Sequence, residues 1–294
     1  MPATTQHLDL HRREIDTPSG PASCLDTGGP GRPAVFVHGL LTSSYLWRNV
    51  LDRLPERRCV AIDLPLHGQT PAADRRDFSL PSLARFVADC CDALGLTDID
   101  LVANDTGGAI AQVFAAGDPD RLHTLTLTNC EAHDNVPPRG SRLAYWLARA
   151  DQATRLDFIA RLGPRRVQTP AARRRMYRSG YQDPAGLPDD IARAWLEPLF
   201  ADRERTRRNL RMFTSIRARD LLAVEPALTR LEVPTLIVWG TGDKFFSRNW
   251  AYWLRDTIPG ATEVVELDGA RLFFPDERAG ELTTALLRHW DAHP

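Results

Sequence analysis

The sequence predicts an α/β protein built on a mostly parallel, twisted sheet with helices on both faces. Short apolar runs alternate with segments of helical periodicity along most of the 294 residues, and several of these runs end in glycine or in a polar residue. Uninterrupted apolar runs are typical of strands buried on both faces, as in parallel sheets. Between residues 135 and 222 the alternation stops and arginine-rich helical pieces replace it. This change indicates an inserted helical unit.

The first six strands and three helices can be assigned in chain order. Imperfect alternation over His7–Ile15 and the run Pro21–Leu25 predict a short antiparallel hairpin. Apolar runs then predict buried strands over Pro33–Val37, Cys59–Leu64, Asp100–Ala103 and Leu122–Cys130. Helices are expected from about Tyr45, where Thr42-Ser43-Ser44 offers an N-cap, over Phe78–Leu94 and over Gly107–Ala116.

The second half of the chain divides into the insertion and the end of the sheet. Within the insertion, helical pieces are expected over 143–149, 153–162, 191–200 and 203–213. Strands follow over Pro234–Trp239 and Thr262–Leu267, and helices over Trp250–Thr257 and Leu282–Trp290. We therefore expect residues 1–134 and 223–294 to form the core and residues 135–222 to form a helical cap, inserted after the sixth strand.

Composition restricts the kinds of molecule that this protein is expected to bind. The formal net charge of −1 argues against an electrostatic nucleic-acid binder, and no apolar run is long enough to span a bilayer. The five cysteines are odd in number and lack metal-ligand spacing. We expect a cytoplasmic protein with reduced thiols, without a cofactor or metal, that acts on a small molecule rather than on nucleic acid or a membrane.

The candidate reaction centre is the stretch Leu101–Ile110, where an apolar run stops at Asp105, turns on Gly107-Gly108 and restarts as a helix. This pattern corresponds to a G-x-S-x-G nucleophile elbow with aspartate as its central residue. A carboxylate in that position can attack carbon to form an ester, or take a proton as a general base. The alternative is a loop that merely caps a helix.

Two further motifs, together with Asp105, resemble the α/β-hydrolase superfamily, in the branch of haloalkane dehalogenases and epoxide hydrolases. His38-Gly39 followed by Thr42–Asn49 is similar to the oxyanion loop of dehalogenases, and Asp63-Leu64-Pro65 with His67-Gly68 is similar to the second loop of that branch. The resemblance implies an α/β-hydrolase fold, with Asp105 as the nucleophile and the insertion as the cap. It places the catalytic acid at Glu131 or at Asp243.

The halide-binding positions depart from the dehalogenase pattern. The resemblance implies an asparagine after His-Gly and a tryptophan after the nucleophile, but this sequence has Leu40 and Thr106 there. Their backbone N–H groups can still form an oxyanion hole. The substrate pocket is expected to include the following six residues: His38, Trp47, Tyr145, Trp146, Leu272 and Phe273.

The larger departure is at the catalytic histidine. The resemblance places it after the last strand, within Gly269–Pro275, where this sequence has Leu272. Loss of a general base costs about 10²–10⁴ in rate, so an Asp105 ester should persist. His133, two residues beyond Glu131, is a candidate for a relocated base; otherwise it lines the cavity or braces the cap.

Without a histidine at position 272, Glu131 and Asp243 are expected to face Asp105 directly. Clustered carboxylates beside an apolar group raise one another's pKa, which favours a shared proton over nucleophilic attack. Our preferred hypothesis is therefore acid/base chemistry by Asp105 in a lyase, isomerase or cyclase acting on an apolar small molecule.

Two other functions stay open. The first is hydrolysis of an epoxide, an ester or a carbon–halogen bond through an Asp105 ester. The second is ligand binding without catalysis. Arginine clusters in the insertion would attract an anionic or phenolic substrate, although solvated helix faces explain them equally well. Similarly, the apolar face of Leu282–Trp290 would suit a homodimer or packing on the sheet.

Overall fold

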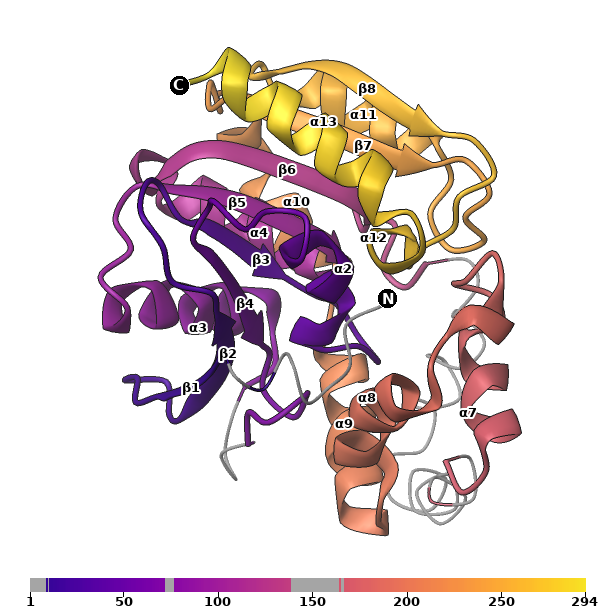
Figure 1. Cartoon of the computed structure of the whole chain (residues 1–294). Helices are drawn as coiled ribbons and strands as arrows, with labels where there is room; N and C mark the ends of the chain where they lie inside the picture. The colour runs from indigo at the N-terminus through magenta and orange to yellow at the C-terminus, as the bar shows by residue number, and fades with distance from the viewer. Residues whose placement is uncertain (1–8, 10, 72–76, 139–163, 165–166) are drawn as a thin grey trace.

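The computed structural model describes residues 9, 11–71, 77–138, 164 and 167–294. Its centre is an eight-stranded sheet in the order β1-β2-β4-β3-β5-β6-β7-β8 (Figure 1). The strands are β1 Arg12–Ile15, β2 Ala22–Asp26, β3 Ala34–Val37, β4 Cys59–Asp63, β5 Ile99–Asp105, β6 Leu122–Cys130, β7 Thr235–Gly240 and β8 Ala261–Leu267.

The sheet is parallel except at its first edge. β1 pairs antiparallel with β2, β2 pairs antiparallel with β4, and the remaining neighbours are parallel. Every residue of β3, β4, β5 and β7 is buried, which explains why these strands are apolar runs without alternation. The predicted hairpin and the mostly parallel α/β sheet are therefore confirmed.

Helices and short 3-10 segments fill the connections. Before β7 they are η1 Ser44–Trp47, α2 Arg48–Leu51, α3 Leu80–Ala93, α4 Thr106–Gly117, η2 Pro119–Arg121, α7 Pro170–Tyr177, η5 Pro184–Gly186, α8 Asp189–Phe200, α9 Arg203–Ser215 and α10 Ala218–Leu228. After β7 they are α11 Asn249–Thr257, α12 Phe274–Glu277 and α13 Ala279–Ala292. Local capping fixes several starts: Ser43 and Ser79 each accept a backbone N–H from the first turn that follows.

The helical insertion follows β6, the sixth strand, as the loss of strand rhythm predicts. α7, α8 and α9 lie together on one side of the molecule (Figure 1). Sequence analysis did not predict α7 or α10, and the expected pieces at 143–149 and 153–162 lie outside the described residues. The expected boundary at residue 222 falls inside α10, which packs against α4 and α3 of the core.

A buried polar network joins the insertion to the core. The hydroxyl of Tyr181 donates to Asp276 at 2.6 Å, and Arg48 lies 2.7 Å from the same carboxylate. Asn49 donates to Asp276 from α2 at 2.8 Å. Loss of one partner of a buried ion pair leaves the other charge buried and unpaired, which strongly destabilises the folded state. This network therefore holds the segment after α7 in place on the core.

α4 packs against the sheet more closely than a helix with side chains would allow. A Cβ on Gly107 would lie 2.3 Å from the carbonyl oxygen of Val37, and one on Gly108 would lie 2.3 Å from the Cβ of Cys130. These distances are below van der Waals contact. The glycines therefore bring the start of α4 against β3 and β6.

We predict that Gly107→Ala destabilises the protein by about 3 kcal/mol, because the backbone carbonyl of Val37 cannot move away as a flexible side chain could. Urea denaturation measures the change. Gly117→Ala is the matched control at the other end of α4, since a Cβ there meets nothing within 4 Å. Equal stabilities of the two variants would contradict the close-packing argument.

Candidate active site

Asp105 stands at the sharp turn between β5 and α4. Its backbone has φ 55° and ψ −135°, a left-handed conformation that residues other than glycine rarely adopt. Such strain persists only where surrounding structure imposes it, and it is concentrated at functional sites. The side chain is 8% exposed, so the turn holds a carboxylate in a nearly closed environment.

Two backbone N–H groups converge on the Asp105 carboxylate. Leu40 donates to Oδ2 at 2.8 Å, and the N–H of Thr106 donates to the same carboxylate. A Cβ on Gly39 would lie 2.2 Å from Oδ2, so glycine is needed for this approach. The two residues that the sequence suggests for an oxyanion hole therefore both bind Asp105 itself.

Glu131 and Asp243 come from the loops after β6 and β7. The hydroxyl of Thr106 donates to Glu131 Oε1 at 2.9 Å, whereas Glu131 Oε2 is buried and has no hydrogen-bond partner. Asp243 accepts from the Asn129 amide at 2.6 Å and from the Phe245 N–H at 2.7 Å. Both carboxylates are thus held at the end of the sheet where Asp105 lies.

Burial shifts the ionisation of all three carboxylates, and repulsion between them adds to the shift at Asp105 and Glu131. Desolvation, then the charges of Glu131 and Asp243, raise the pKa of Asp105 well above its ordinary value. Desolvation raises the pKa of Glu131 to about 7 and that of Asp243 to about 6, against hydrogen bonds that lower each. Groups so placed exchange protons near neutral pH and titrate as a coupled set. We call Asp105, Glu131 and Asp243 the carboxylate cluster.

His133 does not join the cluster through any contact in the described structure. Its Nδ1 lies 2.7 Å from Glu225 Oε2 on α10, and its ring packs against Trp253 and Trp250 with centroid distances of 5.1 and 6.3 Å. These contacts favour the bracing role over a relocated base.

His38 and Trp47 are both fully buried. His38 Nδ1 bonds the Gly39 carbonyl at 2.7 Å, and its Nε2 accepts from Leu64 N–H at 3.0 Å. Burial lowers the pKa of His38 to about 4, so it is neutral at pH 7. His38 therefore braces the oxyanion loop, and the expectation that these two residues line the pocket stays a prediction.

The other expected pocket residues divide into two groups. Tyr145 and Trp146 lie outside the described residues. Leu272 and Phe273 are 4% and 6% exposed and occupy the loop after β8. The Phe273 ring packs against Tyr177 and Tyr181, with centroids at 5.8 and 5.6 Å.

Two asparagines that sequence analysis missed organise the site. Asn104 donates to the Leu272 carbonyl at 3.1 Å and to the Thr128 hydroxyl at 2.9 Å, which ties the loop after β8 to the elbow strand. Asn129 bonds both Asp243 and the backbone of Gly240. Each asparagine lies one residue before the end of its strand, and an amide at that position was the available signal for both.

Tyr177 and Tyr181 are already engaged by the core. The Tyr177 hydroxyl donates to the Leu41 carbonyl at 2.6 Å, next to the oxyanion loop, and the Tyr181 hydroxyl bonds Asp276. Both hydroxyl protons are therefore donated to protein acceptors in this arrangement.

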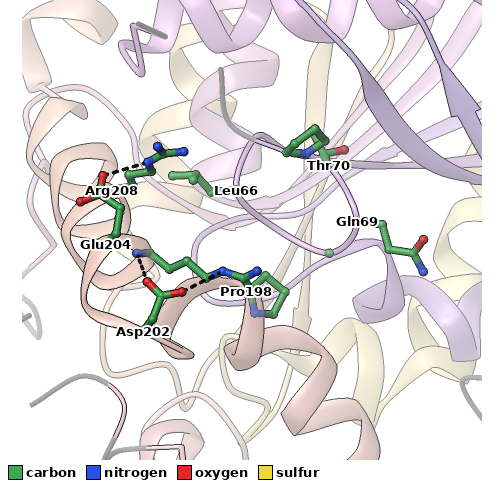
Figure 2. A pocket seen from close by; sticks show the side chains of 10 residues that line it. Leu66, Gln69, Thr70, Pro198, Asp202, Glu204 and Arg208 are labelled. Carbon is green, nitrogen blue, oxygen red and sulfur yellow. Dashed lines mark hydrogen bonds and ion pairs between the residues drawn. The ribbon is translucent and has the colours of Figure 1, made fainter. Parts of the chain in front are cut away.

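A separate cavity of about 450 Å³ lies between the loop at 66–71 and the start of α9 (Figure 2). Glu204 pairs with Arg208 at 3.1 Å on its wall, and Asp202 pairs with Arg205 at 3.3 Å. No member of the carboxylate cluster lines it. It is a charged surface groove rather than the reaction site.

Among the described residues, no group of three histidine, cysteine, aspartate or glutamate side chains is arranged to hold a metal ion. In the same part of the chain, no helix combines the length and apolarity needed to cross a membrane.

The fold and this site define a class of protein, an α/β hydrolase with an aspartate at the nucleophile elbow. The family model described as "alpha/beta hydrolase fold" matches residues 33–278, and the chain belongs to this family.

The chain is similar to two curated relatives and to one solved structure. Over 122 residues it is 37% identical to a haloalkane dehalogenase of Agrobacterium fabrum, a match that covers 40% of each chain. It is 26% identical over 272 residues to the cis-3-alkyl-4-alkyloxetan-2-one decarboxylase of Shewanella oneidensis, covering 87% of this chain and 81% of that one. The crystal structure of haloalkane dehalogenase DbeA from Bradyrhizobium elkani superposes with a TM-score of 0.77 at 23% identity, covering 96% and 97% of the two chains.

The raised pKa of Glu131 predicts that stability falls as pH rises. Its folded pKa of about 7 exceeds the ordinary value of 4.5, so the native state binds the proton more tightly than the unfolded chain between these pH values. Between pH 5 and 8 the charged carboxylate should cost the native state about 2 kcal/mol. Glu131→Gln should reduce that dependence to the part that Asp105 and Asp243 contribute, while it keeps an acceptor for Thr106.

Urea unfolding at pH 5, 6, 7 and 8 gives the slope of the unfolding free energy against pH. A packing defect that destabilises the variant equally at every pH does not change this slope. Glu56→Gln, at an exposed carboxylate, is the control and should retain the wild-type slope. An unchanged slope in Glu131→Gln would show that Glu131 does not hold its proton in the native state.

Proposed function

We propose that this protein is an enzyme acting on an apolar small molecule by non-hydrolytic acid/base chemistry, with Asp105 as the group that transfers the proton. The observation that carries the proposal is the carboxylate cluster itself. Three buried carboxylates surround the elbow, and within the described residues no histidine ring hydrogen-bonds to any of them. Lyase, isomerase and cyclase reactions need this proton transfer but do not need an activated water.

The proposed step moves one proton and leaves the net charge of the enzyme unchanged after each turnover. In an isomerisation or cyclisation, Asp105 takes a proton from one atom of the substrate and returns it to another. In a lyase reaction of the elimination type, Asp105 takes a proton from the carbon next to the bond that breaks and returns it to the leaving group, which carries the electron pair of that bond. Glu131 exchanges protons in the same pH range because its pKa is about 7, and Thr106 fixes one of its oxygens.

The decarboxylase relative supports this choice of reaction class. By its name it removes carbon dioxide from an oxetan-2-one, which is a bond cleavage without hydrolysis, and its similarity extends over 87% of this chain. Apolar substituents on a small lactone or ketone would suit a site closed by Leu272 and Phe273.

We predict that Asp105→Asn lowers turnover about 10²–10⁴-fold, since the amide can neither accept nor return the proton. The assay incubates the enzyme in D₂O with a panel of apolar β-lactones and ketones and follows deuterium incorporation and new products by mass spectrometry. Glu56→Gln is the control at an exposed carboxylate. Wild-type turnover in Asp105→Asn would contradict the proposal.

Hydrolysis through an Asp105 ester is the second candidate, and the similarity to dehalogenases favours it. An Asp105 oxygen would displace a leaving group from carbon, and water would then attack the Asp105 carbonyl carbon. The N–H groups of Leu40 and Thr106 already bind this carboxylate, so they would stabilise the oxyanion of that second step. With leucine at 272, the water lacks its usual base.

We predict that Leu272→His converts a stalled ester into turnover if the ester route exists. Wild-type enzyme incubated with 1-bromobutane should then gain the mass of one butyl group on Asp105, seen by intact-protein mass spectrometry, and Leu272→His should release bromide continuously. Leu272→Gln is the control because it is polar but is a poor base. Repeated bromide release by the wild type would instead make hydrolysis the function, and reaction in neither assay would favour a binding role.

A further inference from the structure

The oxyanion loop is anchored on both sides of Leu40, whose N–H donates to Asp105. Before Leu40, the carbonyl of Gly39 bonds side chains of the loop itself, at 2.7 and 3.3 Å. After Leu40, the carbonyl of Leu41 accepts the hydroxyl of Tyr177 at 2.6 Å. Tyr177 is the last residue of α7, in the helical insertion (Figure 1). The loop that reaches Asp105 is therefore held by the core at one end and by the insertion at the other.

Leu41 has a strained backbone, which makes the second anchor important. Its φ of 63° lies in the left-handed region, which residues other than glycine rarely adopt. Such a conformation persists only where neighbouring groups impose it. The hydrogen bond from Tyr177 fixes the carbonyl of this residue and so opposes its relaxation. Relaxation at Leu41 would turn the chain beside Leu40 and draw its N–H away from Asp105.

Tyr177 can hold the loop because it is itself held. Its side chain is 1% exposed, and its ring packs edge-on against Trp195 and Phe273, with centroids at 5.2 and 5.8 Å. The segment that follows is bonded to the core: the Phe273 N–H donates to the Gly180 carbonyl at 2.9 Å, and Glu277 accepts two backbone N–H groups at 2.8 Å. Burial raises the pKa of the Tyr177 hydroxyl well above its ordinary value, so it keeps its proton and remains a donor.

We propose that Tyr177 is a positioning residue, through which the helical insertion keeps the Leu40 N–H on Asp105. The hydroxyl acts through the backbone of Leu41 rather than on the reacting atoms. The insertion thereby helps to set the ionisation of the candidate reaction centre. The bearing of this role on turnover rests on the proposed function of Asp105, whereas the positioning itself does not.

The hydrogen bond from Leu40 opposes the other influences on Asp105. Burial and the charges of Glu131 and Asp243 raise the pKa of Asp105, whereas the N–H donor lowers it because it stabilises the ionised form. The thiol of Cys130 interacts with the same carboxylate and stays neutral, because burial raises its own pKa. Loss of the Leu40 hydrogen bond should therefore raise the pKa of Asp105 further.

The test follows Asp105 by NMR in the full-length protein, labelled with ¹³C at the aspartate carboxyl carbons. The signal that disappears in Asp105→Asn identifies this residue. Tyr177→Phe keeps the buried ring and removes only the hydroxyl. In Tyr177→Phe, the Asp105 carboxyl should titrate about one pH unit higher than in the wild type. The Leu40 amide should also exchange with solvent about tenfold faster or more.

Tyr181→Phe is the matched control, because it removes an equally buried hydroxyl from the same segment, one that bonds Asp276 instead of the oxyanion loop. Both measurements should keep their wild-type values in this variant. An unchanged Asp105 titration in Tyr177→Phe, or an equal change in Tyr181→Phe, would overturn the proposal. A circular-dichroism melt shows that each variant retains the fold. Neither measurement needs a substrate, so failure of the acid/base proposal in the turnover assay leaves this test intact.

Discussion

Three chain segments approach one another closely around Asp105: the oxyanion loop, the turn itself and the start of α4. This close approach determines the geometry of the candidate active site. Gly39 lets the oxyanion loop reach the carboxylate, and Gly107 and Gly108 let α4 begin directly against β3 and β6. The turn at Asp105 is strained because these contacts leave it no other conformation. The protein thereby holds one side chain in place at a cost in folding stability. This arrangement is expected of an enzyme rather than of a structural domain.

The second constraint is electrostatic, and it follows from the close approach of the chain segments around Asp105. Strands that end side by side bring Asp105, Glu131 and Asp243 to one edge of the sheet, where burial disfavours their ionised forms. A positively charged partner would normally compensate such a group. In the described part of the chain, the partners of these carboxylates are hydroxyl, amide and backbone N–H groups, so their pKa values are raised by burial without an ion pair to lower them.

The fold and the position of Asp105 were predictable from local pattern, and the family resemblance indicated Glu131 and Asp243. The hydrogen bonds and packing contacts that connect the site residues were not predictable. Apolar runs located the strands, and the Gly-Gly turn located Asp105. The partner of His133 depends on α10, ninety residues further along, and Tyr181 meets Asp276 across a similar separation. Sequence periodicity carries no information about such contacts. His38 is fully buried and bonds the Gly39 carbonyl and the Leu64 N–H, contacts that its motif does not specify.

The thiol of Cys130 lies against Gly108, in the same turn that positions Asp105, and the four other cysteines are buried as well. Burial raises the pKa of the Cys130 thiol well above its ordinary value, so its reactive thiolate form is scarce in the native state. An alkylating reagent reaches such a thiol only when the protein opens. The labelling rate of these cysteines therefore measures how often the core opens. At Cys130 the rate measures opening of the nucleophile elbow.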